Sequence, residues 1–173
     1  MNRTLETGTR LAGTVRLDQV SANAGKATDF FRTNVSNDLD SNETNLSGAF
    51  TAGFDLGATW DLSLGIGSVV RTADASERYS DRIPASKAQM TAEFMGNPAL
   101  NPERSTQGDL WLEGVYPRAA FQLNLFARRI SDYITLQPTN PPLSTRLPMS
   151  PKTVYQYING DASFFGGEAS LAY

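Results

Sequence analysis

Cysteine and histidine are both absent from this 173-residue chain, and long apolar runs are missing as well. Without cysteine, the chain holds neither a disulfide framework nor a thiolate site. Without histidine, it lacks serine–histidine and cysteine–histidine catalysis and the ligands of most zinc sites. No stretch approaches the ~18 apolar residues of a membrane-spanning helix, but a transmembrane β-strand needs only ~9–11 alternating residues. The absence of a candidate membrane helix therefore does not exclude the membrane, because β-strands can also span it.

Positive charge is scarce too, since the formal net charge is -3. A nucleic-acid partner is not expected, because phosphate binding requires a basic face. No charged-then-apolar leader precedes Thr7, so either the mature start lies elsewhere or the chain is a fragment. We expect no enzyme, no metal centre and no cofactor in these residues.

Apolar and polar residues alternate with a period of two along six stretches, as in strands with one apolar and one polar face. In one of them Leu62, Leu64 and Ile66 alternate with Ser63 and Gly65. The expected fold is all-β, an antiparallel up-and-down meander of about six strands forming a segment of a transmembrane β-barrel. The predicted strands are residues 10–18, 45–56, 60–71, 106–116, 121–132 and 162–173.

The connections between these strands are of two kinds. Residues 57–59 and 117–118 form hairpin-tight turns, whereas residues 21–43, 73–101 and 138–154 form long polar loops. Short turns at one end and long loops at the other are typical of outer-membrane barrels. Three such loops in one small soluble domain are unusual. One helical turn is expected at residues 73–79.

Charged residues lie on the predicted polar faces. They suit a hydrated lumen or a plug surface, because burying each in a dry core costs several kcal/mol unless it is paired. Inter-strand salt bridges, or the wet face of a soluble sheet, are the alternatives and are favoured for any single residue. These residues are Arg16, Asp55, Asp61, Arg71, Asp109, Glu113, Arg128 and Glu168.

A cluster of charges in the loop at 73–101 is the other candidate site. Asp74, Glu77 and Asp81 lie there beside Arg78 and Arg82. A solvated charged loop is the favoured interpretation, and ligand contact is the alternative. Across the chain, the candidate ligand-binding residues are Arg71, Asp74, Glu77, Arg78, Asp109, Glu113 and Arg128.

Three aromatic residues fall at or near predicted strand ends, namely Trp60, Tyr116 and Tyr173. Aromatic girdles occupy such positions at membrane interfaces. The alternative is that aromatic residues are merely common in strands.

A segment rich in Gly, Asn and Pro at residues 96–105, GNPALNPERS, opens directly into the strand at 106–116. Pro98 and Pro102 hold the chain extended there. The segment resembles the "GNP-x-L-x-PE" signature at which TonB-dependent outer-membrane receptors enter a barrel strand. The residues carried over from the family motifs are Gly96, Asn97, Pro98, Leu100, Pro102, Glu103 and Glu168.

The resemblance extends over nearly the whole chain through the order of its motifs. Residues 62–77, 121–135 and 154–171 resemble successive barrel strands of that family, and RTADASERY at residues 71–79 resembles copper-receptor members. Met90 and Met95 offer thioethers to copper, but without histidine packing is the favoured role.

The resemblance implies that residues 1–173 are a partial receptor barrel domain without the plug domain and TonB box. A transporter barrel has ~22 strands, so six are a fraction of one. The implied location is the bacterial outer membrane, and the implied function is uptake of a scarce ligand such as a metal–siderophore complex or a metal ion. The implied partners are outer-membrane lipid, the plug domain, the TonB complex and a small ligand.

The alternative function is that of a soluble β-sheet module that binds a ligand or carbohydrate through Trp60 and Trp111. An enzymatic interpretation would need an acid–base pair such as Glu77 with Asp81, and their place in a loop makes it poor. The barrel and the module differ in where the apolar faces go, toward lipid or toward each other.

Overall fold

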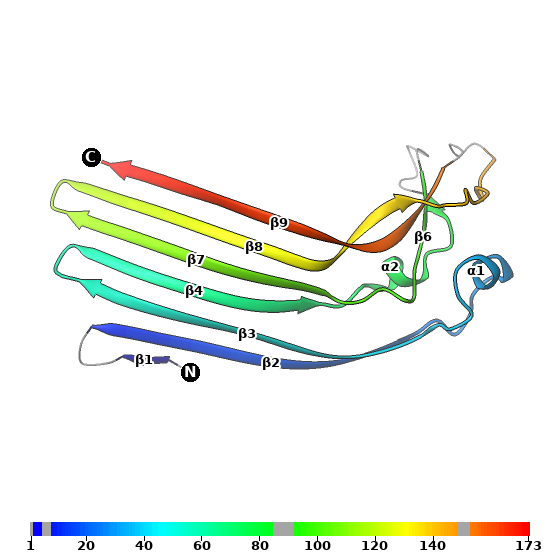
Figure 1. Cartoon of the computed structure of the whole chain (residues 1–173), viewed down its shortest axis with the longest axis horizontal. Helices are drawn as coiled ribbons and strands as arrows, with labels where there is room; N and C mark the ends of the chain where they lie inside the picture. The colour runs from blue at the N-terminus through cyan, green and yellow to red at the C-terminus, as the bar shows by residue number, and fades with distance from the viewer. Residues whose placement is uncertain (1, 5–7, 85–91, 149–152) are drawn as a thin grey trace.

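All the strands of the described part belong to one curved, open sheet (Figure 1). The computed structural model describes residues 2–4, 8–84, 92–148 and 153–173. The strand order is β1-β2-β3-β4-β7-β8-β9-β6-β5. The long strands are β2 (Thr9–Asn23), β3 (Asp40–Leu56), β4 (Trp60–Arg71), β7 (Glu103–Tyr116), β8 (Ala119–Pro138) and β9 (Val154–Ala172). The short elements are β1 (Asn2–Thr4), α1 (Asp29–Asn34), α2 (Ala75–Tyr79), β5 (Ile83–Pro84) and β6 (Glu93–Met95).

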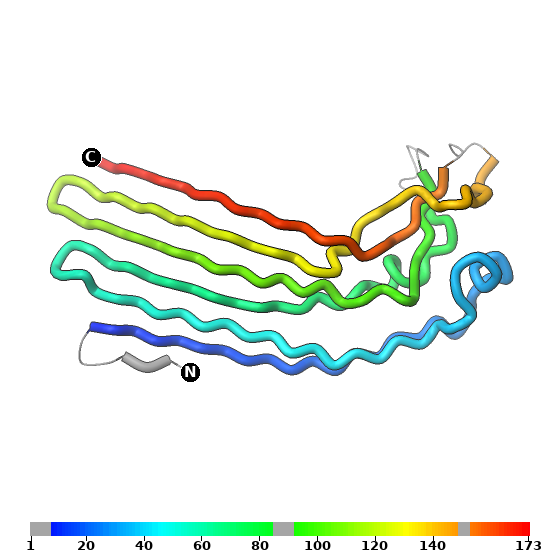
Figure 2. The backbone as a smooth tube through the Cα atoms, in the orientation of Figure 1, coloured from blue at the N-terminus to red at the C-terminus, as the bar shows by residue number. Residues whose placement is uncertain are grey.

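The six long strands confirm the predicted meander. Each pairs antiparallel with the next long strand in the chain. Tight turns join them at one end and long connections at the other, as the tube in Figure 2 shows. Helix α2 confirms the predicted helical turn in the loop at 73–101.

Several strands run further toward the loops than the alternating pattern predicted. Pairing of β2 with β3 continues through Ser21↔Asn42, where the serine hydroxyl donates to the asparagine side chain at 2.6 Å. On β3 the extension at residues 40–44 is polar on both faces, so no apolar alternation marks it. The parallel pairing of β6 with β9 was also not predicted, because its two partners lie about 60 residues apart in the chain.

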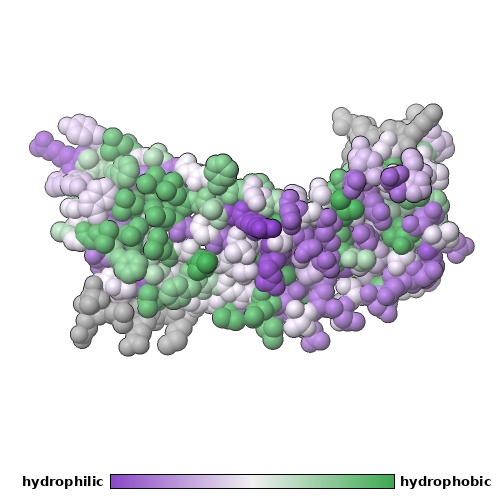
Figure 3. Space-filling model, in the orientation of Figure 1, coloured by the Kyte–Doolittle hydropathy of each residue, from purple (hydrophilic) through white to green (hydrophobic). Residues whose placement is uncertain are grey.

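The register separates the sheet into two faces. One row across five strands consists of Leu11, Ala52, Leu64, Leu110 and Leu125. Leu64 is 42% exposed and Leu125 44% exposed. The apolar face, as we call it, contains Leu11, Val15, Leu46, Phe50, Leu64, Ile66, Leu110, Leu112, Leu125, Phe165 and Leu171. Figure 3 shows hydrophobic residues gathered over the hairpin-turn half of the molecule and hydrophilic ones toward the loops.

The opposite side is the polar face, which contains Arg10, Asp55, Asp61, Arg71, Asp109, Glu113, Gln122, Arg128 and Glu168. No second sheet packs on either face in the described part of the chain. The alternative of a soluble module required two apolar faces packed against each other, as in a β-sandwich. The observed single sheet is not a sandwich.

Buried side chains gather at the loop end of the sheet. Phe31, Leu39, Met95 and Val154 form one cluster. A second consists of Ala73 after β4, Leu100 before β7 and Ile134 of β8. Met95 is fully buried, in agreement with its expected packing role, whereas Met90 lies outside the described residues. No helix in the described ranges has the length and apolar character to span a membrane.

Candidate functional site

The polar face carries charged side chains in the same rows across neighbouring strands. Asp55, Asp61, Glu113 and Gln122 lie in one row, at the turn end of the sheet. Arg10 from β2 forms ion pairs with both Asp55 and Asp61. From the sequence, these residues were expected either to line a hydrated lumen or to form inter-strand salt bridges. The structure shows Asp55 and Asp61 in inter-strand salt bridges.

Two candidate ligand-binding carboxylates further along this face have amide partners instead. Asp109 accepts a hydrogen bond of 2.7 Å from the Gln107 amide, and Glu113 accepts one of 3.1 Å from the Gln122 amide. An amide leaves the carboxylate charge uncompensated. The spare lone pairs of these carboxylates can therefore bind a cation or hydrogen-bond donors.

Other residues of this face add an arginine and an aromatic surface. Arg128 Nε donates to Ser105 Oγ at 2.7 Å. Trp111, which is 40% exposed, shares its row with Asn124 and Glu168. The face therefore offers charges of both signs and an exposed indole ring.

At the loop end, Arg71 joins the sheet to helix α2. Its Nε lies 2.6 Å from Glu103 Oε2, and its two terminal nitrogens lie 2.9 Å and 3.1 Å from the carboxylate oxygens of Glu77. Such bidentate pairs are stronger and better oriented than single contacts. Glu103 Oε1 also accepts the backbone N–H of Ile134 at 2.7 Å, so this network connects β4, β7, β8 and α2.

Asp74 begins helix α2 with a capping box. One of its oxygens accepts the backbone N–H groups of Ser76 and Glu77, both at 2.8 Å, while the Glu77 side chain accepts the Asp74 N–H. The D-x-x-E spacing produces this arrangement directly. The Ser76 hydroxyl and the Glu77 N–H lower the pKa of Asp74 below its ordinary value.

Arg78 is the most deeply buried of the candidate ligand-binding residues, at 1% exposure. Its Nη1 donates to the carbonyls of Pro98 at 2.9 Å and Leu100 at 3.1 Å. Its Nη2 forms an ion pair with Glu43, which is itself 11% exposed. All these contacts hold the loop onto the sheet, a role that the charge pattern of the sequence did not indicate.

Gly96 opens the family signature because a backbone passes against it. A Cβ atom there would lie 2.5 Å from the carbonyl carbon of Arg78 and 2.6 Å from the nitrogen of Tyr79. The Gly96 N–H donates to Ser80 O at 2.7 Å. Only glycine permits this approach of the signature to the end of α2.

The asparagines of the signature bind β9. Asn97 donates to the Tyr157 carbonyl at 3.2 Å, and its own side-chain oxygen accepts the Ala99 N–H at 3.0 Å. Asn101 and Asn159 exchange two hydrogen bonds, of 2.9 Å and 3.1 Å. The β9 partners lie about 60 residues away, so no local pattern in the sequence indicated these contacts.

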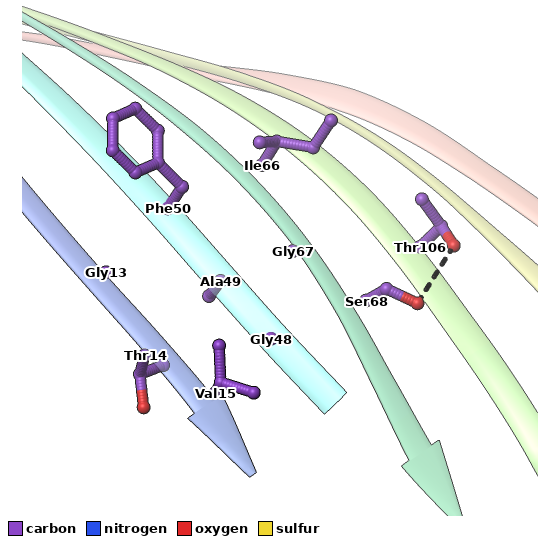
Figure 4. A pocket seen from close by; sticks show the side chains of 10 residues that line it. All are labelled: Gly13, Thr14, Val15, Gly48, Ala49, Phe50, Ile66, Gly67, Ser68 and Thr106. Carbon is purple, nitrogen blue, oxygen red and sulfur yellow. Dashed lines mark hydrogen bonds between the residues drawn. The ribbon is translucent and has the colours of Figure 1, made fainter. Parts of the chain in front are cut away.

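A shallow groove of about 790 Å³ lies across strands β2, β3, β4 and β7 (Figure 4). Val15, Phe50 and Ile66 stand around it, and Gly48 and Ser68 line its floor. Most of this lining belongs to the apolar face. Among the residues that the structure describes, no group of three acidic side chains is arranged to hold a metal ion.

The chain is similar to known proteins in both sequence and fold. A family model described as TonB dependent receptor-like, beta-barrel, matches residues 4–173. A search of curated proteins found no match.

Solved structures share the fold. The copper transporter OprC is 20% identical with a TM-score of 0.70, over 98% of this chain and 24% of that one. The siderophore receptor PirA from Pseudomonas aeruginosa is 19% identical with a TM-score of 0.65, over 97% of this chain and 29% of that one. The FrpB iron transporter from Neisseria meningitidis (F3-3 variant) is 16% identical with a TM-score of 0.65, over 99% and 22%. The chain thus spans about a quarter of the length of these relatives.

Proposed function

Because the chain belongs to the TonB-dependent receptor β-barrel family, we propose that it forms part of the wall of a receptor that takes up a scarce small ligand. Members of this family are transporters of the bacterial outer membrane and not enzymes. The proposed ligand is a metal–siderophore complex, a metal ion or a similar small molecule. Residues 1–173 would form a partial barrel domain, and the plug domain and TonB complex would act on the complete receptor.

The observation that carries this proposal is the two-sided character of the single sheet. An apolar face of this size is stable where lipid covers it, whereas the charged face requires water or polar partners. Aromatic rings mark the turn end of the apolar face. Trp60 packs edge-on against Tyr116 and Phe121, at centroid distances of 6.1 Å and 5.9 Å, and its Nε1 donates to the Tyr116 hydroxyl at 3.0 Å. This placement supports the girdle interpretation.

The proposed ligand contacts lie at two heights of the polar face. Asp109, Glu113 and Arg128 face the lumen with uncharged partners, so their charges remain available to a passing ligand. The network of Arg71, Asp74, Glu77 and Arg78 lies at the outer rim, where it would act mainly by holding the loop in place.

Transport assays on the complete receptor test this function. We expect Asp109→Asn combined with Glu113→Gln to reduce uptake of a ferric siderophore or metal-ion substrate by about tenfold, because two charge contacts are each worth roughly a factor of three or more. Asp29→Asn, an acidic residue in the first turn of α1, is the matched control and should keep normal uptake. Uptake of every tested metal and chelate at the wild-type rate by the double variant would contradict the assigned contacts. A complete receptor that supports no TonB-dependent uptake at all would contradict the function.

A further inference from the structure

Two arginines stand on the apolar face close to its loop-side limit. Arg104 on β7 pairs with Ser131, and Arg129 on β8 pairs with Thr106. The two arginines are therefore diagonal neighbours, and such neighbours are about 7–8 Å apart. Both are exposed. Two like charges at this spacing repel each other, so an anion between them would stabilise the pair.

Their depth matches the second membrane interface. Along β7, Arg104 lies about twelve residues from Tyr116 in the aromatic cluster, which is about 41 Å of strand at ~3.4 Å per residue. With the ~45° tilt of barrel strands, the rise is about 29 Å, slightly more than the ~25 Å apolar band of such barrels. The aromatic cluster then marks one lipid interface and the arginine pair marks the other.

The partners that the arginines already have leave this charge largely free. Arg104 donates to Leu46 O and to Ser68 Oγ, both at 3.3 Å, and these acceptors carry no net charge. Arg129 lies 3.9 Å from Asp161, in a pair whose side chains are 71% and 66% exposed. A solvated ion pair of this length contributes little, so it does not neutralise Arg129 firmly.

An apolar groove begins beside Arg129. It has a volume of about 640 Å³, and its lining includes Ile66, Ala127 and Phe165 as well as the hydroxyl groups of Thr106 and Ser163. Thr106 and Ser163 lie in the same row as Arg129, and Ile66, Ala127 and Phe165 form the next row toward the hairpin turns. This order of chemistry, anion-binding groups above and hydrocarbon below, matches the order in a phosphate-bearing lipid.

We propose that Arg104 and Arg129 bind the phosphate of an anionic lipid in the outer leaflet, with an acyl chain lying in the groove between Ile66 and Phe165. The planar guanidinium groups suit the phosphate oxygens, which they bind by two parallel hydrogen bonds. This lipid would fix the height of β7 and β8 in the membrane. The site lies on the face opposite to the proposed ligand contacts, so it is independent of them.

Lipid retention by the complete receptor tests the proposal. The purified receptor is exchanged into mixed micelles of phosphatidylglycerol and phosphatidylcholine with identical acyl chains, and bound lipid is counted by native mass spectrometry. We expect a preference for phosphatidylglycerol that falls about tenfold or more in the R104Q/R129Q variant, because each arginine near a lipid surface contributes roughly a factor of five. The matched control is R16Q/R32Q, which removes the same charge from the polar face and from helix α1, away from the groove.

Each outcome is decisive. Loss of the preference in R104Q/R129Q alone supports the site. An unchanged preference in that variant, or an equal loss in R16Q/R32Q, overturns it. Inorganic phosphate added at the lipid's molar concentration should displace little lipid, and complete displacement would show an anion site without the acyl groove. Circular dichroism of each variant confirms that the barrel is folded.

Discussion

At the scale of single residues, the signature at 96–105 is explained by packing. Gly96 touches the backbone of α2, and Asn97 and Asn101 hold β9. The two asparagine contacts satisfy backbone groups of β9 and of the signature itself. The signature therefore fixes where the long loop meets the sheet, and no ligand chemistry is needed to explain it.

Replacing Gly96 with alanine tests this explanation. The new Cβ would meet the Arg78 carbonyl at 2.5 Å, so the loop must move and the Gly96–Ser80 hydrogen bond must lengthen. We expect a cost of about 1–3 kcal/mol, seen as faster hydrogen exchange at the α2 amides. Gly25→Ala is the control, because no atom lies within 4 Å of the Cβ position there. Equal exchange in the two variants would show that the close approach has no energetic importance.

Asp74 gives a prediction for pH. Its pKa in the folded chain lies below the ordinary value of an aspartate. Its capping therefore stabilises α2 fully above that ordinary value and is lost as the pH falls through the folded pKa. At neutral pH, Asp74→Ala should cost about 1 kcal/mol of helix stability. Hydrogen exchange at α2, corrected for the intrinsic pH dependence, measures both effects. In the alanine variant, hydrogen exchange at α2 should no longer accelerate as the pH falls. If it still accelerates, a group other than Asp74 causes the pH dependence.

At the scale of elements, helix α2 connects the loop at residues 73–101 to the sheet through side-chain contacts. The helix has only five residues. An isolated helix of this length is not stable in water, so contacts with the rest of the chain keep it folded. Arg71 binds it from β4, and the buried Arg78 reaches from it to the signature. The charges that a sequence presents as a solvated cluster therefore contribute to the architecture of the outer rim.

At the scale of the whole molecule, the proposed function requires the sheet to separate an environment of lipid from one of water. Adjacent residues of one strand test this separation. A nitroxide label on Leu125→Cys should collide with oxygen dissolved in lipid, whereas a label on Asn124→Cys should not, because successive side chains point to opposite faces. Power-saturation EPR of the complete reconstituted receptor measures both collision rates. Equal oxygen accessibility at the two positions would contradict the lipid-facing assignment of the apolar face.

The sequence by itself determined the six long strands, their order and the two faces, because a period of two and tight turns are local properties of the chain. Strand β4 has the predicted bounds of residues 60–71. Where both faces of a strand are polar, as at residues 40–44 of β3, a period of two in hydrophobicity cannot be recognised, and the strand extends beyond the prediction.

Only the tertiary structure decided what the charged residues do. Arg78 and Arg71 look alike in the sequence, yet Arg78 is buried against distant carbonyls and Arg71 is half-exposed between two glutamates. The diagonal placement of Arg104 and Arg129 likewise depends on the register of β7 against β8. Such roles depend on contacts between residues tens of positions apart, and no local pattern encodes a distance between two strands.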